Sequence, residues 1–173
     1  MIGPPPHTLQ IRSAEPRDTR LLRVLIREAA FWRPGQSRPS LELALADPAV
    51  ARYVENFGRR GDVGVIALLD RTAVGAAWWR YFSADAPGYG FVDESIPEVS
   101  IAVLPGHRGK GVGTQLLNEL RRRARDQGVR RLSLSVERDN AAYGLYERLG
   151  FQAIGRDEGA QTMVLDTSRL HAR

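Results

Sequence analysis

The chain has 173 residues, of which 43% are hydrophobic and 26% charged, with a formal net charge of +5, which is typical of one globular domain with a full core. It contains no cysteine, which excludes disulfides, thiolate metal sites and a cysteine nucleophile and is in keeping with a cytoplasmic location. No run approaches the roughly 18 apolar residues of a membrane-spanning helix, and the opening residues lack the features of a secretory signal, so we expect no membrane association.

The first third of the chain is predicted to hold one strand and two helices. Residues 8–14 have the composition of a strand. A helix is expected over 19–30, because its leucines and isoleucine fall on one face and Asp18 stands at the capping position. Residues 41–57 are also predicted to be helical, with a break near Pro48.

The remainder of the chain alternates strands and helices. Two apolar runs flank Asp70 and Arg71, which predicts a β-hairpin, and a turn-rich loop over 84–97 follows. The later predicted elements are a strand at 98–104, a helix at 111–127, a strand at 130–137, a short helix at 140–150, and strands at 151–156 and 161–166. This order predicts a mixed α/β fold.

No linker, internal repeat or low-complexity tract divides this pattern. We therefore expect a single domain over residues 8–167. Residues 1–7, which include three successive prolines, and residues 168–173 are expected to be tails, the first of them disordered.

The segment GHRGKGVG at 106–113 places glycines between a predicted strand and a predicted helix. Glycine permits sharp turns and the close approach of a ligand to the backbone. The helix N-terminus that follows presents free N–H groups and the positive end of the helix dipole, a combination that binds phosphate. Arg108 and Lys110, the latter the only lysine in the chain, add positive charge. The segment therefore predicts a phosphate-binding loop.

Two common phosphate-binding motifs fit this loop poorly. A nucleoside-triphosphate loop requires a serine or threonine after its lysine, whereas Lys110 is followed by glycine. A dinucleotide fingerprint requires a third glycine where Leu116 stands, although Glu137 lies near the position of its acidic residue. The basic charge also leaves a nucleic-acid-binding module as an alternative. Against it, the arginines are spread along the chain, and we expect the run at 121–125 to form a solvated helix face.

Two motifs together carry a family resemblance. Residues 108–113 match R/Q-x-x-G-x-G/A, and Asn140 with the run LYERLGF at 145–151 matches N…LYE+xGF. At this spacing they resemble the GCN5-related N-acetyltransferases, the GNAT superfamily, and the resemblance extends in element order over about residues 8–167. It implies the α/β (α+β) GNAT fold, a mixed and mostly antiparallel sheet of six to seven strands flanked by about four helices. The segments GYGFVDE and FWRPG resemble a bacterial subgroup.

The resemblance also implies an activity. Members of the family transfer the acetyl group of acetyl-CoA to a primary amine of a small molecule, peptide or protein. The amine attacks directly within a ternary complex, and no metal is implied. His107 lies beside the loop without a second ligand at metal-binding spacing, which agrees with that expectation. The alternative from another class is a non-catalytic acyl-CoA sensor, and a homodimer is left open.

In the family, acetyl-CoA lies in a V-shaped opening between the strand before the loop and the strand after the helix. The resemblance implies that backbone groups of Ile101, Val103 and Leu104 pair with the pantetheine and that the Val103 N–H holds the oxyanion. Asn140 and Tyr143 are expected to contact the cosubstrate from the other side, with a helix N-cap as the alternative role for Asn140. The pyrophosphate is expected on Arg108, Gly109, Lys110, Gly111, Val112, Gly113 and Thr114.

Acetyl transfer needs groups that handle protons. A lysine-like amine, with a pKa near ~10.4, is mostly protonated at neutral pH, so a general base or a water relay is required. Glu98, at the start of a predicted strand, is our candidate base, with Asp93 and Glu94 as alternatives. The resemblance implies that Tyr146 protonates the departing thiolate, with Tyr143 as its rival.

Trp78 and Trp79 are adjacent in a predicted strand and must therefore point to opposite sides of the sheet. We expect one of the two indoles to lie in the core and the other to line the acceptor pocket. The sequence does not distinguish them.

Overall fold

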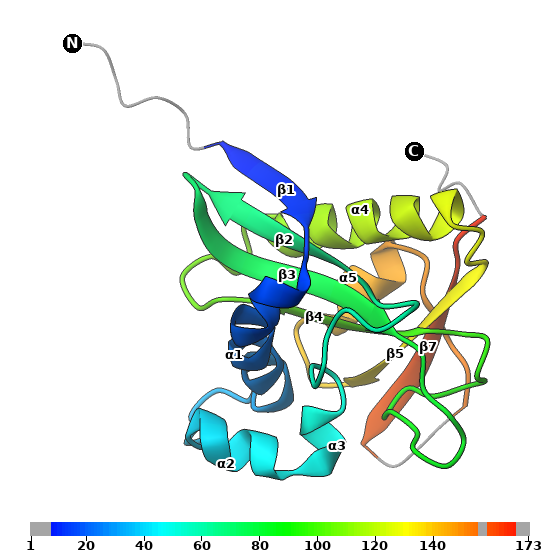
Figure 1. Ribbon diagram of the computed structural model, residues 1–173, viewed down its shortest axis with the longest axis horizontal. Coiled ribbons are helices and arrows are strands. Elements are labelled where there is room, and N and C mark those ends of the chain that lie inside the picture. The colour runs from blue at the N-terminus through cyan, green and yellow to red at the C-terminus, as the bar shows by residue number, and fades with distance from the viewer. Residues whose placement is uncertain (1–7, 156–158, 169–173) are drawn as a thin grey trace.

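The computed structural model describes residues 8–155 and 159–168, which form one open seven-stranded sheet with helices on both faces (Figure 1). The strands lie in the order β1-β2-β3-β4-β5-β7-β6, and every neighbouring pair is antiparallel except β4 and β5. Their bounds are β1 Leu9–Ser13, β2 Val63–Leu69, β3 Thr72–Arg80, β4 Glu98–Val103, β5 Arg131–Glu137, β6 Gln152–Ala153 and β7 Ala160–Asp166. The predicted mixed, mostly antiparallel sheet is confirmed. The tail expected at 1–7 and residues 169–173 lie outside the described residues.

The described residues form five α-helices, one more than the roughly four expected, and one short 3-10 helix. They are the 3-10 helix η1 (Pro16–Asp18) and the α-helices α1 Thr19–Ala30, α2 Leu41–Ala46, α3 Pro48–Ala51, α4 Val112–Asp126 and α5 Tyr143–Arg148. The segment 41–57 is divided at Asp47, whose carboxylate accepts a hydrogen bond from the Ala49 N–H at 2.8 Å and caps α3. Within the described ranges, no helix is long and apolar enough to cross a membrane.

The start of α1 is where the sequence predicts it, but the Asp18 side chain does not cap the helix. Its carboxylate accepts hydrogen bonds from both terminal nitrogens of Arg12, at 2.7 and 2.8 Å, and from the Glu15 N–H at 2.9 Å. The hydrogen bonding from Arg12 is the main cause that lowers the pKa of Asp18, and the bond from the Glu15 N–H adds to it. The pair ties the end of β1 to the start of α1.

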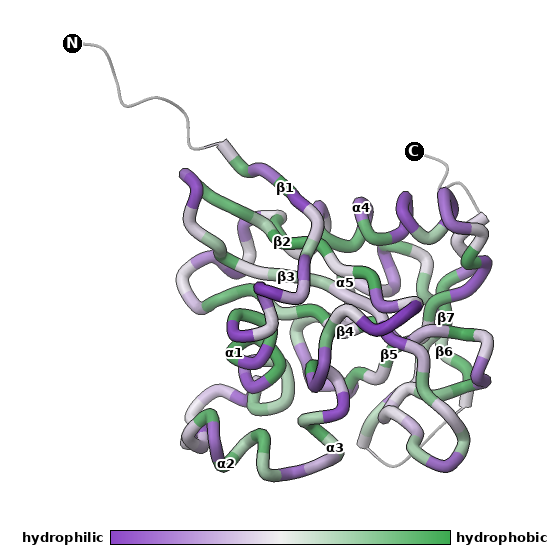
Figure 2. Tube along the Cα trace, in the orientation of Figure 1, coloured by the Kyte–Doolittle hydropathy of each residue, from purple (hydrophilic) through white to green (hydrophobic). Residues whose placement is uncertain are grey.

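Each face of the sheet buries its own apolar layer. One layer lies under α4 and α5 and includes Val99, Leu116 and Leu120; the other lies under α1 and the 50–57 segment and includes Leu25 and Ala102. Figure 2 shows α4 hydrophobic toward the sheet and hydrophilic on its outer side. The apolar side of α4 therefore packs on the sheet, and its polar side faces outward.

Trp78 and Trp79 point to opposite faces, as expected, but both are fully buried. The Trp78 indole N–H donates to the Tyr53 carbonyl and the Trp79 indole N–H to the Gly61 carbonyl, each at 2.9 Å. The expectation that one of them lines an acceptor pocket is wrong. Helices or loops cover both faces of β3, so each ring has a core of its own.

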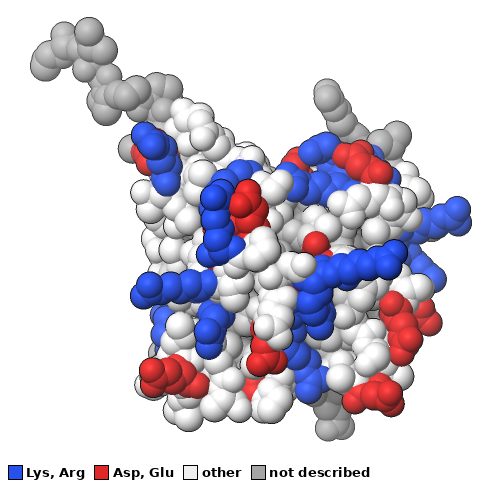
Figure 3. All heavy atoms as spheres, in the orientation of Figure 1, with Lys and Arg blue, Asp and Glu red and all other residues white. Residues whose placement is uncertain are grey.

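The surface carries charges of both signs. On the face shown in Figure 3, basic and acidic side chains are interspersed. In the arginine run on α4, Arg122 pairs with Glu119 and Asp126, both at 2.7 Å. Arg121 departs from the predicted solvated face because it is buried, and two of its nitrogens have no hydrogen-bond partner in the described part of the chain.

Candidate functional site

Strands β4 and β5 separate to form a V-shaped opening. They are paired at a single position, Glu98 with Ser133, next to which the Ser133 N–H donates to the Pro97 carbonyl at 3.0 Å. Beyond this point β4 continues along β3 and β5 continues along β7. The apex of the V therefore lies at Glu98, and the facing edges of the two strands carry backbone groups outside the ladder.

The backbone of β4 alternates between its two neighbours. The Leu104 N–H donates to the Val74 carbonyl at 2.8 Å and so faces β3. Because backbone groups alternate along a strand, those of Val103 and Ile101 face the V. Leu104 does not fit its expected role beside them, because its carbonyl also accepts a hydrogen bond from the His107 N–H, at 3.1 Å.

The glycine-rich loop leads from β4 into α4 and leaves an open space in front of the helix N-terminus. Gly111 is the N-cap residue in a left-handed conformation, with φ of 81°. The first α-helical hydrogen bond of α4 runs from the Gln115 N–H to the Gly111 carbonyl. The N–H groups of residues 112–114 therefore have no acceptor within the helix. A Cβ added at Gly109 or Gly111 would meet no protein atom within 4 Å. The loop therefore has the room and the donors that a phosphate group requires.

The two family motifs contact each other through Gly113. A Cβ at this position would lie 3.2 Å from Leu145 Cδ2 and 3.8 Å from Ile101 Cδ1. The missing side chain thus allows α4 to approach α5 and β4 closely. This explains a glycine whose φ is not in the left-handed region.

The two basic residues of the loop take different positions. Lys110 is exposed and forms no ion pair with any described residue. Arg108 departs from its expected place at the phosphate, because its Nε donates to the Val103 carbonyl at 2.8 Å and its Nη2 to Glu28 Oε2 at 3.2 Å. Glu28 is a buried residue of α1, so the Arg108 side chain ties the loop to that helix.

A second set of ion pairs links the loop after α1 to the end of β5. The Arg33 guanidinium contacts carboxylate oxygens of Glu137 and Asp139, each at 2.5 Å. Glu137, which resembled the acidic residue of a dinucleotide site, is therefore engaged by a protein cation. This removes the one feature that favoured that motif.

Asn140 and Tyr143 lie around the start of α5. Asn140 Oδ1 accepts a hydrogen bond from the Ala142 N–H at 2.9 Å, which supports the turn into α5. Its side-chain amide N–H₂ donates to no described residue. Tyr143 is half-buried and lines an open pocket of about 420 Å³ with Arg138 and Gln161.

Tyr146 lies on the α4 side of the sheet. Its ring is buried and meets the Phe151 ring edge-on, with the centroids 5.8 Å apart. Burial raises the pKa of the Tyr146 hydroxyl above its ordinary value of 10.0, so the phenol stays protonated at neutral pH. The neutral phenol can therefore donate a proton at neutral pH.

Glu98 lies on the opposite face, at the apex of the V, and only 3% of it is exposed. Its Oε1 accepts hydrogen bonds from the Tyr53 hydroxyl at 2.7 Å and from the Gly90 N–H at 2.8 Å, whereas Oε2 has no hydrogen-bond partner among the residues that the structure describes. Burial raises the pKa of Glu98 to about 7, against the lowering effect of the two hydrogen bonds. The carboxyl can thus gain and lose a proton near neutral pH.

The alternative carboxylates occupy less suitable positions. Asp93 and Glu94 are exposed; Asp93 accepts hydrogen bonds from the N–H and hydroxyl of Ser95, and Glu94 accepts one from the Ala84 N–H. The bonds from Ser95 lower the pKa of Asp93. Neither carboxylate is buried, so Glu98 is favoured.

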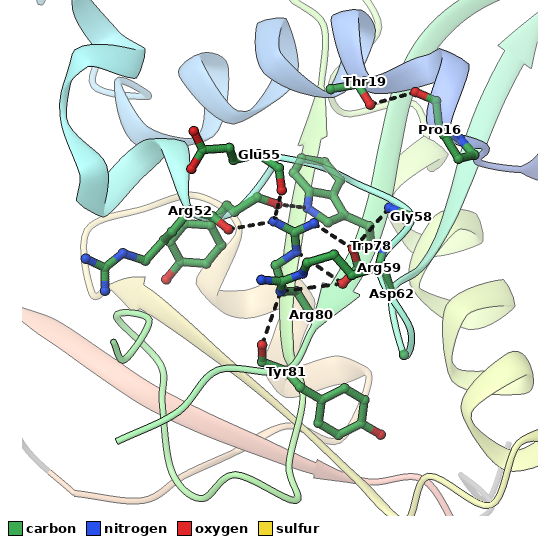
Figure 4. A network of polar contacts seen from close by, with 12 residues as sticks. Pro16, Thr19, Arg52, Glu55, Gly58, Arg59, Asp62, Trp78, Arg80 and Tyr81 are labelled. Carbon is green, nitrogen blue, oxygen red and sulfur yellow. Dashed lines mark hydrogen bonds and ion pairs between the residues drawn. The ribbon is translucent and has the colours of Figure 1, made fainter. Parts of the chain in front are cut away.

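A buried cation supports the wall of the site behind Glu98. Arg80, the cross-strand partner of Glu98, is 1% exposed and does not bond to it. Figure 4 shows its guanidinium instead on Asp62, at 2.6 and 3.1 Å, and on the carbonyls of Arg52 and Glu55, both at 2.7 Å. The Asp62 carboxylate neutralises the charge of Arg80. The bonds from Arg80 to the carbonyls of Arg52 and Glu55 hold the segment that carries Tyr53 against β3.

Comparison with known proteins supports one family. The profile of the Acetyltransferase (GNAT) family matches residues 20–151. The L-methionine sulfoximine/L-methionine sulfone acetyltransferase of Pseudomonas paraeruginosa is 47% identical over 60 residues, which cover 34% of this chain and 35% of that protein. The matched stretch is therefore about a third of the length of that relative.

Solved structures resemble nearly the whole chain. The ribosomal-protein-alanine N-acetyltransferase of Brucella melitensis has a TM-score of 0.65 and 26% identity, covering 91% of this chain and 99% of that one. The PaiA N-acetyltransferase of Thermoplasma acidophilum, solved in complex with coenzyme A, has a TM-score of 0.67 and 18% identity, covering 92% and 99%. The second likeness shows the fold alone.

Proposed function

The chain belongs to the Acetyltransferase (GNAT) family, and on this premise we propose that it transfers the acetyl group of acetyl-CoA to a primary amine by direct attack in a ternary complex. The observation that carries the proposal is the buried carboxyl of Glu98, poised near neutral pH at the apex of the V. The open glycine loop at the mouth of the same V supports it. The acceptor is a small molecule, a peptide or a protein amine.

Residues of the loop and of both strands would hold acetyl-CoA, which supplies the acetyl thioester when bound. The amides of residues 109–114 and the Lys110 ammonium fit a pyrophosphate, because the space in front of them is open. Backbone groups of Ile101 face the V and fit the amides of the pantetheine, whereas the Val103 carbonyl already accepts a hydrogen bond from Arg108 Nε. The Asn140 side-chain amide, which has no partner among the described residues, would donate to the pantetheine from the other side. The Val103 N–H would stabilise negative charge on the thioester oxygen.

Proton transfer falls to two side chains from opposite faces of the sheet. Glu98 would accept the proton that the acceptor ammonium must lose before it attacks. Tyr146 would give its proton to the departing sulfur, because its buried phenol is neutral at working pH. No cysteine is present to form an acyl-enzyme, in agreement with direct attack.

A non-catalytic acyl-CoA sensor is not favoured. A sensor would need the loop but not a buried carboxyl with a raised pKa, which lowers stability at neutral pH. The relatives named above are acetyltransferases. The bacterial relatives also support a bacterial protein, and the absence of cysteine supports the cytoplasm as its location.

The test is acetyl-CoA turnover against a panel of amines, with coenzyme A release followed by a thiol reagent. Because the chain has no cysteine, the protein itself gives no background signal. The panel includes methionine sulfoximine, polyamines, aminoglycosides and peptides with an N-terminal alanine. We expect turnover with at least one acceptor and at least a 10²-fold loss in Glu98→Gln at neutral pH. Tight binding of acetyl-CoA by calorimetry, without turnover on any amine, would favour the sensor.

A further inference from the structure

The two carboxylate oxygens of Glu98 differ in their hydrogen bonds. Oε1 receives two hydrogen bonds, from the Tyr53 hydroxyl and the Gly90 N–H. Oε2 is buried and receives no hydrogen bond from any described residue. On the same face of the sheet, Ser133, the residue paired with Glu98, carries a hydroxyl that is also buried without a partner. The two unpartnered oxygens thus belong to neighbouring strands at the apex of the V.

Tyr53 is fixed from several directions. Its hydroxyl donates to Glu98 Oε1 and accepts a hydrogen bond from the Tyr89 N–H at 2.6 Å. Its backbone carbonyl accepts from the Trp78 indole, and its ring stacks on the Tyr89 ring with the centroids 6.2 Å apart. Burial and the nearby carboxylate raise the pKa of Tyr53 above its ordinary value of 10.0, so the phenol remains a donor across the working pH range.

We propose that Tyr53 is the positioning residue of the proposed general base: it holds Oε1 of Glu98 and thereby reserves Oε2 as the atom that takes the acceptor's proton. In this step one N–H bond of the acceptor ammonium breaks, and because Oε2 lies buried beneath Gly88 the proton reaches it through a water relay; an O–H bond forms at Oε2, leaving a neutral amine and a neutral carboxylic acid. The inference rests on the proposed function for its catalytic part only. The hydrogen bond and its effect on the ionisation of Glu98 are independent of turnover.

The other groups around the carboxylate do not replace Tyr53. Arg80 faces Glu98 from β3, but Asp62 and two carbonyls occupy its guanidinium. The Gly90 N–H contributes the second hydrogen bond and stays in place when a side chain is changed. Tyr89 presents only its backbone N–H and its ring to this network. Tyr53→Phe therefore removes one donor and leaves the remaining charges unchanged.

The experiment compares Tyr53→Phe with Tyr89→Phe, which also loses one hydroxyl but from a side chain that is 64% exposed. The Glu98 carboxyl is titrated by carbon-13 NMR, and its resonance is assigned by its loss in Glu98→Gln. A hydrogen bond to the ionised form favours ionisation, so its removal raises the midpoint. We expect an upward shift of about one pH unit in Tyr53→Phe and less than about 0.2 units in Tyr89→Phe.

The acidic limb of the pH–rate profile for acetyl transfer is expected to move upward by the same amount. An unchanged Glu98 midpoint in Tyr53→Phe overturns the positioning role. A shifted midpoint with an unmoved acidic limb overturns Glu98 as the base, and with it the catalytic part of the inference. If Tyr53→Phe does not fold, the contact is tested in the wild type by carbon-13 labelling of the tyrosine Cζ atoms and an NMR titration. The Tyr53 resonance must then titrate with the Glu98 midpoint, and a flat resonance refutes the contact.

Discussion

The ionisation of Glu98 predicts how the stability of the fold depends on pH. Its pKa is about 7 in the folded protein, against an ordinary value of 4.5. Because the folded value is the higher one, the contribution of this group to stability is complete below pH 4.5 and is lost as the pH rises through 7. Between pH 5 and pH 8 this linkage amounts to about 2.5 kcal/mol of unfolding free energy.

Replacing Glu98 by glutamine removes this pH-dependent contribution. Urea unfolding of wild type and Glu98→Gln at pH 5, 6, 7 and 8 gives the free-energy difference between them, in which the titration of all other groups cancels. We expect the difference to move in favour of the variant by about 2.5 kcal/mol from pH 5 to pH 8. Glu147→Gln, the same change at an exposed residue of α5, is the control and should give a flat difference. A flat difference for Glu98→Gln would refute the reasoning, since the carboxyl would then titrate alike in the folded and unfolded chains.

Three further outcomes are expected. Tyr146→Phe should lower kcat by roughly 10²-fold with little change in the affinity for acetyl-CoA, measured by stopped-flow kinetics and calorimetry; a larger loss in Tyr143→Phe would transfer the acid role to its rival. Gly111→Val should abolish measurable acetyl-CoA binding, whereas Gly106→Val, equally strained at φ of 87° and also facing open space, should retain it; equal losses would mean that strain alone is responsible. Asp62→Asn should cost about 3–5 kcal/mol of unfolding free energy, because it leaves the buried Arg80 without its counter-ion, whereas Asp126→Asn, at an exposed pair, should cost less than about 1 kcal/mol.

Most of the fold follows from local sequence patterns. The hairpin at Asp70 and Arg71, for example, forms where two apolar runs meet, and both residues adopt the left-handed conformation that a tight hairpin turn requires. The division of the predicted 41–57 helix also follows from the sequence, because Pro48 can begin a helix but not continue one. The burial of both tryptophans could not be predicted from local sequence, because it depends on which distant segments cover each face of β3.

The sequence predicts the parts of the candidate site but not the contacts between them. The glycine loop and Glu98 are found from sequence because each belongs to a local pattern of strand and turn. Tyr53 lies 45 residues from Glu98, and Glu28 lies 80 residues from Arg108, so neither contact leaves a local signal. The ion pair of Arg80 does have a local sequence signal. This arginine ends the apolar run TAVGAAWW, and an arginine that is buried there requires a counter-ion.

The glycines of the GYG segment that precedes β4 are explained by close approach rather than by turn geometry. Neither Gly88 nor Gly90 has a positive φ. A Cβ at Gly88 would collide with Glu98 Oε2 and lie 2.7 Å from the Tyr53 hydroxyl, and a Cβ at Gly90 would lie 2.5–2.8 Å from the backbone of Leu134 and Ser135. The segment therefore packs its bare backbone over the carboxylate and against β5. A side chain at Gly88 would force Glu98 out of this enclosure toward water, and the lower pKa that follows would make the carboxylate a weaker base.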